Sequence, residues 1–181
     1  EAIEKCSEIR KALPRFRVSI NISQVQASKS DVIQDISAEM NRTGLPLEAL
    51  IVELTESDLL EQNINEKHFL TELKRMGISL ARDDFGTGYS NFHYLSELKP
   101  ELITIDRSFP AKSVADEQEY SLLNQFCTMT HNLDMKICIE GVENAQEWLK
   151  IRKLRPEFTQ GYFWGKPCGY EELMRKFTER S

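Results

Sequence analysis

The chain has 181 residues, 40% of them hydrophobic and 29% charged, and a formal net charge of −6. This length suits one globular domain with its own core and is short for two. Because lysines and arginines are scattered among acids, the composition argues against a broad nucleic-acid groove and leaves room for a small anionic ligand held through metal ions. No apolar stretch approaches the ~18 residues of a membrane span.

The opening residues, EAIEKCSEIRK, are charged and helical in character, unlike a signal peptide. We therefore expect a cytoplasmic location, with any membrane anchor of the full-length protein outside this segment. The cysteines form no CxxC pair, and the three histidines show no ligand spacing; the cysteines are Cys6, Cys127, Cys138 and Cys168. We expect neither a zinc site nor a disulfide framework.

Six short runs rich in valine, isoleucine and leucine recur along the chain, at residues 18–23, 49–56, 78–84, 102–106, 136–141 and 158–164. Segments with helical spacing of apolar residues lie between them, at residues 31–43, 66–76, about 90–98, 117–132 and 145–154. This alternation predicts βαβ units and a parallel sheet.

Polar residues lie in or directly after these runs: Asn21, Glu53, Glu56, Asp83, Asp84, Asp106, Glu140, Glu143 and Gln160. Since no GxGxxG or Walker-type loop follows the first run, we favour a (β/α) barrel, in which all strands end on one face. Any one of these carboxylates could instead cap the next helix. Capping does not explain Asn21, Glu53 and Asp106, which lie within apolar runs where an unpaired polar group is costly to bury.

The adjacent Asp83 and Asp84 end one run, and Gly86 and Gly88 supply the turn that follows. Several facing carboxylates stay ionised only when cations lie among them. All-oxygen ligands suit Mg²⁺ or Mn²⁺, whereas Ca²⁺ would bind without necessarily supporting chemistry. The residues therefore indicate metal-dependent phosphoester chemistry.

Several motifs resemble, in order and spacing, those of the EAL domain family between about residue 16 and residue 173. They are NIS (21–23), ELTES (53–57), DDFGTGYS (83–90), IDRSF (105–109), EGVE (140–143) and QGY (160–162). The family comprises bacterial cyclic di-GMP phosphodiesterases and their inactive relatives. The resemblance implies a modified (β/α)8 TIM-type barrel that opens cyclic di-GMP to linear pGpG with two Mg²⁺ or Mn²⁺ ions.

The resemblance also implies roles for individual residues. Asn21, Glu53 and Asp83 match ligands of the first metal ion. Asp83, Asp84 and Asp106 match groups around the second.

Other matches concern the water, the loop and the ligand. Glu140 matches the carboxylate that helps to activate the attacking water, and Glu56 matches the residue that fixes the loop after DDFG. Glu143 and Gln160 match supporting groups near the metals and ligand. Residues 85–91 resemble the segment that couples dimerisation to metal binding.

The sequence also departs from the family pattern. The glutamate that names the family belongs to a strand before residue 1, so we expect residues 1–181 to be a single EAL domain fragment without its N-terminal strand and helix. Thr104 stands where active members have a catalytic lysine. Arg82 replaces an aliphatic residue, either as a surface substitution or as a partner of a nearby acid. Glu147 replaces a glutamine.

These departures lead us to expect weak or lost turnover, because a threonine hydroxyl brings no charge to the phosphate. The alternative is a catalytically degenerate cyclic di-GMP receptor or regulatory domain. The expected partners are cyclic di-GMP and a GGDEF or sensor domain in the full-length protein. Unpaired barrel edges would favour a homodimer.

Overall fold

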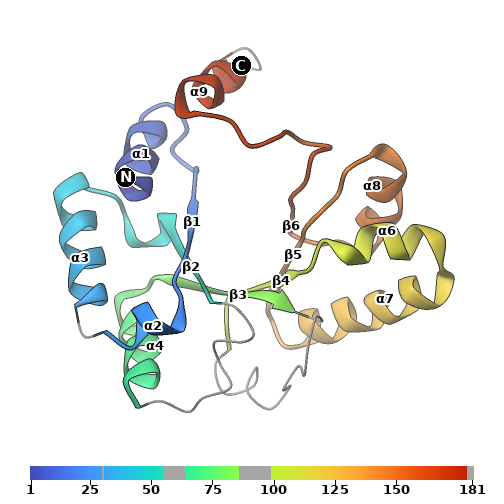
Figure 1. Ribbon diagram of the computed structural model, residues 1–181, viewed down its shortest axis with the longest axis horizontal. Helices are drawn as coiled ribbons and strands as arrows, with labels where there is room; N and C mark the ends of the chain where they lie inside the picture. Colours follow the sequence, from blue (N-terminus) through green and yellow to red (C-terminus); the bar gives the residue numbers. More distant parts are fainter. Residues whose placement is uncertain (30, 55–63, 86–98, 179–181) are drawn as a thin grey trace. The chain divides into compact units, whose positions relative to one another are not determined.

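The computed structural model describes residues 1–29, 31–54, 64–85 and 99–178 (Figure 1). Its helices are α1 (Ala2–Arg10), α2 (Gln24–Ala27), α3 (Val32–Thr43), α4 (Ile64–Met76), α6 (Ser108–Ala115), α7 (Glu117–Asn132), α8 (Ala145–Ile151) and α9 (Tyr170–Thr178). Short 3-10 turns are η1 (Leu47–Ala49) and η3 (Arg152–Leu154). The strands are β1 (Val18–Asn21), β2 (Leu50–Leu54), β3 (Ser79–Phe85), β4 (Leu102–Ile105), β5 (Lys136–Ile139) and β6 (Phe158–Thr159).

All six predicted runs contain a strand, and four predicted helices correspond to α3, α4, α7 and α8 with η3. The helix expected at about 90–98 lies outside the described residues. The sequence did not lead us to expect α6 or α9. The strand predicted at 158–164 is shorter than expected, because β6 ends at Thr159 and the chain then turns at Gly161.

The sheet has the strand order β1-β2-β3-β4-β5-β6, which is the order along the chain. The pairs β3–β4, β4–β5 and β5–β6 are parallel. An open doubly wound sheet reverses its strand order at a switch point, whereas a (β/α) barrel does not. The observed order therefore confirms the barrel-type topology.

The chain divides into two compact units. The first comprises residues 1–52, 62–79 and 166–181, and the second comprises residues 53–61 and 80–165. Each is described by itself below. No helix in the described ranges is both long enough and apolar enough to cross a bilayer.

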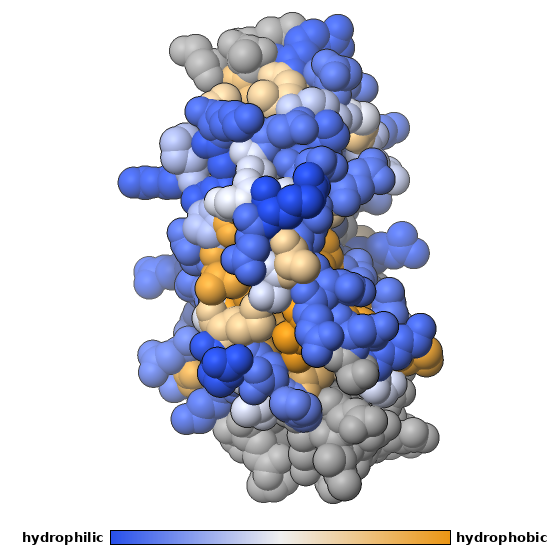
Figure 2. All heavy atoms as spheres, turned by 90° about the vertical axis from the view of Figure 1, so that its left-hand side faces the viewer, coloured by the Kyte–Doolittle hydropathy of each residue, from blue (hydrophilic) through white to orange (hydrophobic). Residues whose placement is uncertain are grey.

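In the first unit, α1 packs against α3. Their facing sides are apolar: Ile3, Cys6 and Ile9 on α1 and Ile36 and Met40 on α3 are buried. The outer side is polar, and Figure 2, which faces α1 and α3, shows a largely hydrophilic surface with apolar residues visible near its centre.

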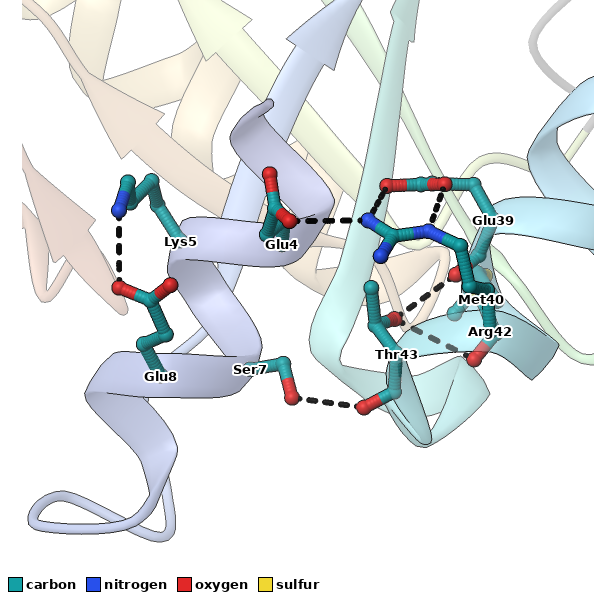
Figure 3. A network of polar contacts seen from close by, with 8 residues as sticks. All are labelled: Glu4, Lys5, Ser7, Glu8, Glu39, Met40, Arg42 and Thr43. Atoms are coloured by element: carbon teal, nitrogen blue, oxygen red, sulfur yellow. Dashed lines mark hydrogen bonds and ion pairs between the residues drawn. The ribbon is translucent and has the colours of Figure 1, made fainter.

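Polar contacts join the same two helices (Figure 3). The Arg42 guanidinium donates to Glu39 on its own helix and, at 3.0 Å, to Glu4 of α1. Ser7 Oγ donates to the carbonyl of Thr43 at 2.8 Å. These contacts align α1 with the end of α3, where Gly44 adopts a left-handed conformation that closes the helix.

In the second unit, one face of the sheet packs against α6, α7 and α8, which Figure 1 shows beside β4 to β6. The buried residues of this core are Ile105, Leu123, Cys127, Ile137, Ile139, Val142, Ile151 and Leu154. Since successive side chains of a strand alternate between faces, the neighbouring residues of β4 and β5 point to the opposite face. That opposite face carries Thr104 of β4 and its pairing partner Cys138 of β5.

Candidate functional site

The carboxyl ends of β4, β5 and β6 meet at one edge of the second unit. Thr104 pairs with Cys138, and Cys138 pairs with Phe158. The ladder continues one residue beyond the strands, because Glu140 N–H donates to the Ile105 carbonyl and Gln160 N–H donates to the Ile139 carbonyl, each at 3.0 Å. Backbone hydrogen bonds therefore hold Glu140 and Gln160 at neighbouring places on this edge.

A register shift explains how two adjacent aspartates can occur in β3. Arg82 pairs with Ile103, but Phe85 pairs with Ile105, so the backbone of Asp83 and Asp84 together opposes the single residue Thr104. Such a β-bulge re-aims side chains and is frequent beside active sites. The side chain of Asp84 itself lies outside the described ones.

Three carboxylates act electrostatically on one point of this face, the thiol of Cys138. Burial first, and then the negative charges of Glu140, Glu53 and Asp83, together raise the pKa of Cys138 to about 12. These acids come from the ends of three different strands. Three of the acids that the sequence predicted for a shared site therefore lie near enough to one thiol to act on it electrostatically.

Carboxylate oxygens are the donors that hard divalent cations prefer, so the residues of this face fit Mg²⁺ or Mn²⁺ by chemistry. Among the side chains that the structure describes, no group of three or more aspartates, glutamates, histidines or cysteines is placed so that it could hold a metal ion. Asn21 ends β1 in the first unit with an exposed side chain, and its part in the site stays a prediction. Glu56 lies outside the described residues.

Asp106 follows β4 and is held as a carboxylate. Burial alone would raise its pKa, but hydrogen bonds from Ser108 and from the backbone of Arg107 outweigh burial and leave the pKa below its usual value. One of these is the Ser108 N–H, which donates to Asp106 Oδ1 at 2.9 Å. Asp106 is therefore ionised and oriented at neutral pH.

Thr104 lies in the strand between these acids and is 2% exposed. Its Oγ1 has no hydrogen-bond partner in the described part of the chain. A buried hydroxyl is normally satisfied, so this atom is available to a water molecule or a ligand. The Thr104 side chain carries no charge.

Arg82 is buried rather than exposed, with 5% of its surface in solvent, so the prediction of a surface substitution is wrong. The physical reason is strand alternation, since Arg82 pairs with Ile103, which is fully buried on the face opposite Thr104.

Two glycines let the loops after β5 and β6 come close to other backbone. Gly141 has φ +71°, and a Cβ there would lie 2.4 Å from Arg107 Cβ. Gly161 has φ +154°, and a Cβ there would lie 2.1 Å from the Val142 carbonyl oxygen. Only glycine meets both conditions, which accounts for the glycines of EGVE and QGY.

Glu143 and Glu147 lie at the start of α8. Glu143 is exposed, and its N–H donates to Glu147 Oε2 at 2.7 Å. The Asn144 side chain accepts from Glu147 N–H and donates to Glu147 Oε1. This reciprocal cap gives Glu147 a structural role, which the spacing Asn-x-x-Glu could have revealed in the sequence. Cys138 also lies in the site, but no signal in the sequence pointed to it.

A described cavity lies elsewhere. It measures about 750 Å³ and is lined in the first unit by residues of α2, α3 and α4, including Ile33, Ser37, Phe69 and Met76. None of the predicted site residues lines it.

Comparisons with known proteins agree with the motifs. The family profile described as EAL domain matches residues 1–167. The cyclic di-GMP phosphodiesterase NbdA of Pseudomonas aeruginosa is 32% identical over 90% of this chain, which corresponds to 21% of NbdA. The chain thus spans about a fifth of the length of this curated relative.

Solved structures share the fold. The EAL enzyme Bd1971, in a form bound to cAMP and cyclic di-GMP, superposes with a TM-score of 0.91 at 26% identity, over 97% of this chain and 49% of that one. The manganese and cyclic di-GMP complex of Klebsiella pneumoniae BlrP1 has a TM-score of 0.79 at 22% identity, over 91% of this chain and 42% of that one, which shows the fold alone. With a profile match over most of its length and the strand order of a (β/α) barrel, the chain belongs to the EAL domain family, the family of the cyclic di-GMP phosphodiesterases.

Proposed function

We propose that this domain binds cyclic di-GMP at the carboxylate face of the sheet, with two divalent cations, and opens it slowly to linear pGpG. The observation that carries the proposal is the position of Glu53, Asp83 and Glu140 at the carboxyl ends of β2, β3 and β5, near enough to Cys138 to act on it electrostatically. Relatives named as cyclic di-GMP phosphodiesterases supply the ligand class. The family match covers residues of both compact units, which supports reading residues 1–181 as one EAL domain.

In this proposal, different residues bind the metal ions, accept the proton from water and support the site. Glu53, Asp83, Asp84 and Asp106, with Asn21, offer oxygen atoms for two Mg²⁺ or Mn²⁺ ions. Such ions, when bound, neutralise phosphate charge and lower the pKa of water. Glu140, whose N–H donates to the Ile105 carbonyl at the end of β4, would accept a proton from the attacking water. Glu56, Glu143 and Gln160 keep supporting roles.

Thr104 limits the rate in this proposal. Thr104 pairs with Cys138 of β5, and its backbone opposes that of Asp83 and Asp84 of β3. Its hydroxyl can hold a water molecule by a hydrogen bond but cannot offset negative charge on the phosphate. Losing one preorganised electrostatic group costs about 2.7 to 4 kcal/mol of barrier in comparable sites, or two to three orders of magnitude in rate.

The second candidate function is a receptor that binds cyclic di-GMP without turnover and signals to a neighbouring domain. The neutral, buried Thr104 favours it. A neighbouring GGDEF or sensor domain and a homodimer are part of this proposal for the whole protein.

The test compares the full-length protein with its Thr104→Lys variant in Mn²⁺. Calorimetry measures cyclic di-GMP binding, and chromatography measures pGpG. We expect binding by both proteins and a rate about 10²-fold higher for Thr104→Lys. Thr128→Lys, on the exposed side of α7, is the matched control and should not raise the rate.

Each outcome is decisive. Rapid hydrolysis by the natural sequence would rule out the receptor. If both proteins bind cyclic di-GMP and neither hydrolyses it, the slow enzyme is ruled out and the receptor function remains. Absence of binding by a folded protein would contradict both functions.

A further inference from the structure

An aromatic and basic patch lies on the outer side of α8 and η3 and on the chain after β6. The Trp148 ring meets the Trp164 ring edge-on with centroids 5.1 Å apart, and Trp164 meets Phe163 at 4.8 Å. Leu149 is 51% exposed and Trp164 is 46% exposed. Large apolar side chains gathered in this way on a surface mark an interaction site, whereas single ones do not.

Positive charge borders these rings. Arg152 and Lys153 follow Trp148 and Leu149 at a spacing of four residues, so they lie one helical turn further along the same side, and Arg155 follows η3. All three basic side chains are exposed, and none forms an ion pair with a described residue.

Elsewhere in the described part of the chain, basic residues are commonly neutralised by acids. Arg42 pairs with Glu39, Arg75 with Glu72, and Lys136 with Glu101. Basic residues without an ion pair to a described residue also occur in the first unit, for example Lys11 and Arg15. In the α8 patch (Trp148, Leu149, Arg152, Lys153, Phe163 and Trp164), by contrast, they adjoin exposed apolar and aromatic side chains, on a chain whose net charge is −6. That combination indicates a partner with both apolar and negatively charged groups.

We propose that the α8 patch docks the protein on an anionic lipid surface. Tryptophan and leucine favour the depth of the headgroups and upper acyl chains, while arginine and lysine favour anionic headgroups. Trp148 packs partly against the core of the second unit, whereas Phe163 and Trp164 lie on the chain after β6 and are 37% and 46% exposed. These rings line neither the cavity beside α2, α3 and α4 nor the one at residues 13–16. This arrangement suits a continuous bilayer surface better than an acidic peptide, which would need a groove to hold it.

The tryptophans provide a direct readout, because the chain has two and both lie in the patch. The protein is mixed with vesicles of equal parts phosphatidylglycerol and phosphatidylcholine, or with phosphatidylcholine alone. We expect co-sedimentation and a blue shift of tryptophan fluorescence with the anionic vesicles, and weakening of both as salt is raised. No nucleotide is needed, so the result is independent of the proposed function.

Two double variants test the site. Arg152→Glu with Lys153→Glu should lower partitioning into anionic vesicles by at least about tenfold, at roughly 1 kcal/mol per basic residue. Lys11→Glu with Arg15→Glu makes the same change of net charge at exposed positions of the first unit and should have a much smaller effect.

Three results would overturn the proposal. The first is no binding of anionic vesicles by protein with native circular dichroism. The second is an equal loss in both double variants, which would reduce the effect to net charge. The third is salt-sensitive binding of polyglutamate without vesicle binding, which would assign the patch to an acidic protein.

Discussion

Thr104 and Thr130 are equally buried threonines in opposite circumstances. Thr104 is 2% exposed and its hydroxyl has no partner among the described residues, whereas Thr130 is fully buried and donates its hydroxyl to the Phe126 carbonyl at 3.0 Å. Leaving a buried hydroxyl unsatisfied costs about 1 to 3 kcal/mol. A comparison of the two positions therefore separates the free-energy cost of burying a hydroxyl from the stabilisation that a hydrogen bond provides.

Replacement of each threonine by the isosteric valine should have opposite effects. We expect Thr104→Val to raise the free energy of unfolding by about 1 kcal/mol and Thr130→Val to lower it by about 1 kcal/mol. Urea titration followed by circular dichroism measures both. Loss of stability in Thr104→Val would mean that its hydroxyl already has a partner, such as a bound water molecule.

A comparison of two glycines separates backbone strain from steric overlap. Gly44 and Gly141 both have positive φ, but a Cβ at Gly44 meets nothing within 4 Å, whereas one at Gly141 overlaps Arg107. We expect Gly44→Ala to cost about 1 kcal/mol of stability and Gly141→Ala about 1 to 3 kcal/mol more. Equal melting temperatures for the two variants would contradict the close approach at Gly141.

At the scale of elements, α8 is a short helix that depends on its first turn. The Glu147 N–H of this turn donates to Asn144 Oδ1, and the carboxylate of the buried Glu147 accepts from the N–H of Glu143, just before the helix. This explains why glutamate is accepted where the family usually has glutamine, since either side chain offers an acceptor oxygen at the third helical position.

Removal of this cap should destabilise the second unit. We expect Glu147→Ala to lower the free energy of unfolding by about 1 to 2 kcal/mol, and Glu147→Gln to change it by less than about 0.5 kcal/mol. Gln146→Ala, at an exposed neighbouring position, serves as the control and should be nearly neutral. A large loss in Glu147→Gln would show that the negative charge, rather than the cap, is needed.

Elements also differed in how well the sequence predicted them. The runs of β2 to β5 and the helices α3, α4 and α7 were expected within a few residues, because their apolar periodicity is strong. The helix α6 was not expected, since it is short and contains Pro110 in its first turn. Its buried Pro110 and Ser113 show that packing against α7 and α8 stabilises it despite weak local preference.

At the scale of the whole molecule, one buried thiol, Cys127, and one partly buried thiol, Cys138, link stability to alkaline pH. Burial and then Glu157 raise the pKa of Cys127 to about 12, and burial and then the site carboxylates raise that of Cys138 to about 12. An unfolded thiol ionises near pH 8.5. The contribution of these thiols to the free energy of unfolding is therefore fully present below about pH 8.5. It is lost as the pH rises toward 12, because in that range only the unfolded chain gains thiolates.

We expect the free energy of unfolding to fall by up to roughly 2 kcal/mol per thiol between pH 8 and pH 10. In the variant Cys127→Ala with Cys138→Ala, the stability at pH 8 should be lower but its decline with pH should be much shallower. Chemical denaturation across this range measures the slope. An unchanged slope in the double variant would contradict the raised pKa values of the two thiols.

By itself, the sequence determined the alternation of strands and helices, the family, and the acids that end the strands, because periodicity and motif spacing are local properties of the chain. The tertiary structure decided which residues from distant parts of the sequence become neighbours. It placed Asp83 and Asp84 opposite Thr104 through a register shift, directed Arg82 into the interior, and set Cys138 among three carboxylates. Register and burial depend on residues far apart in sequence, so only the folded chain defines them.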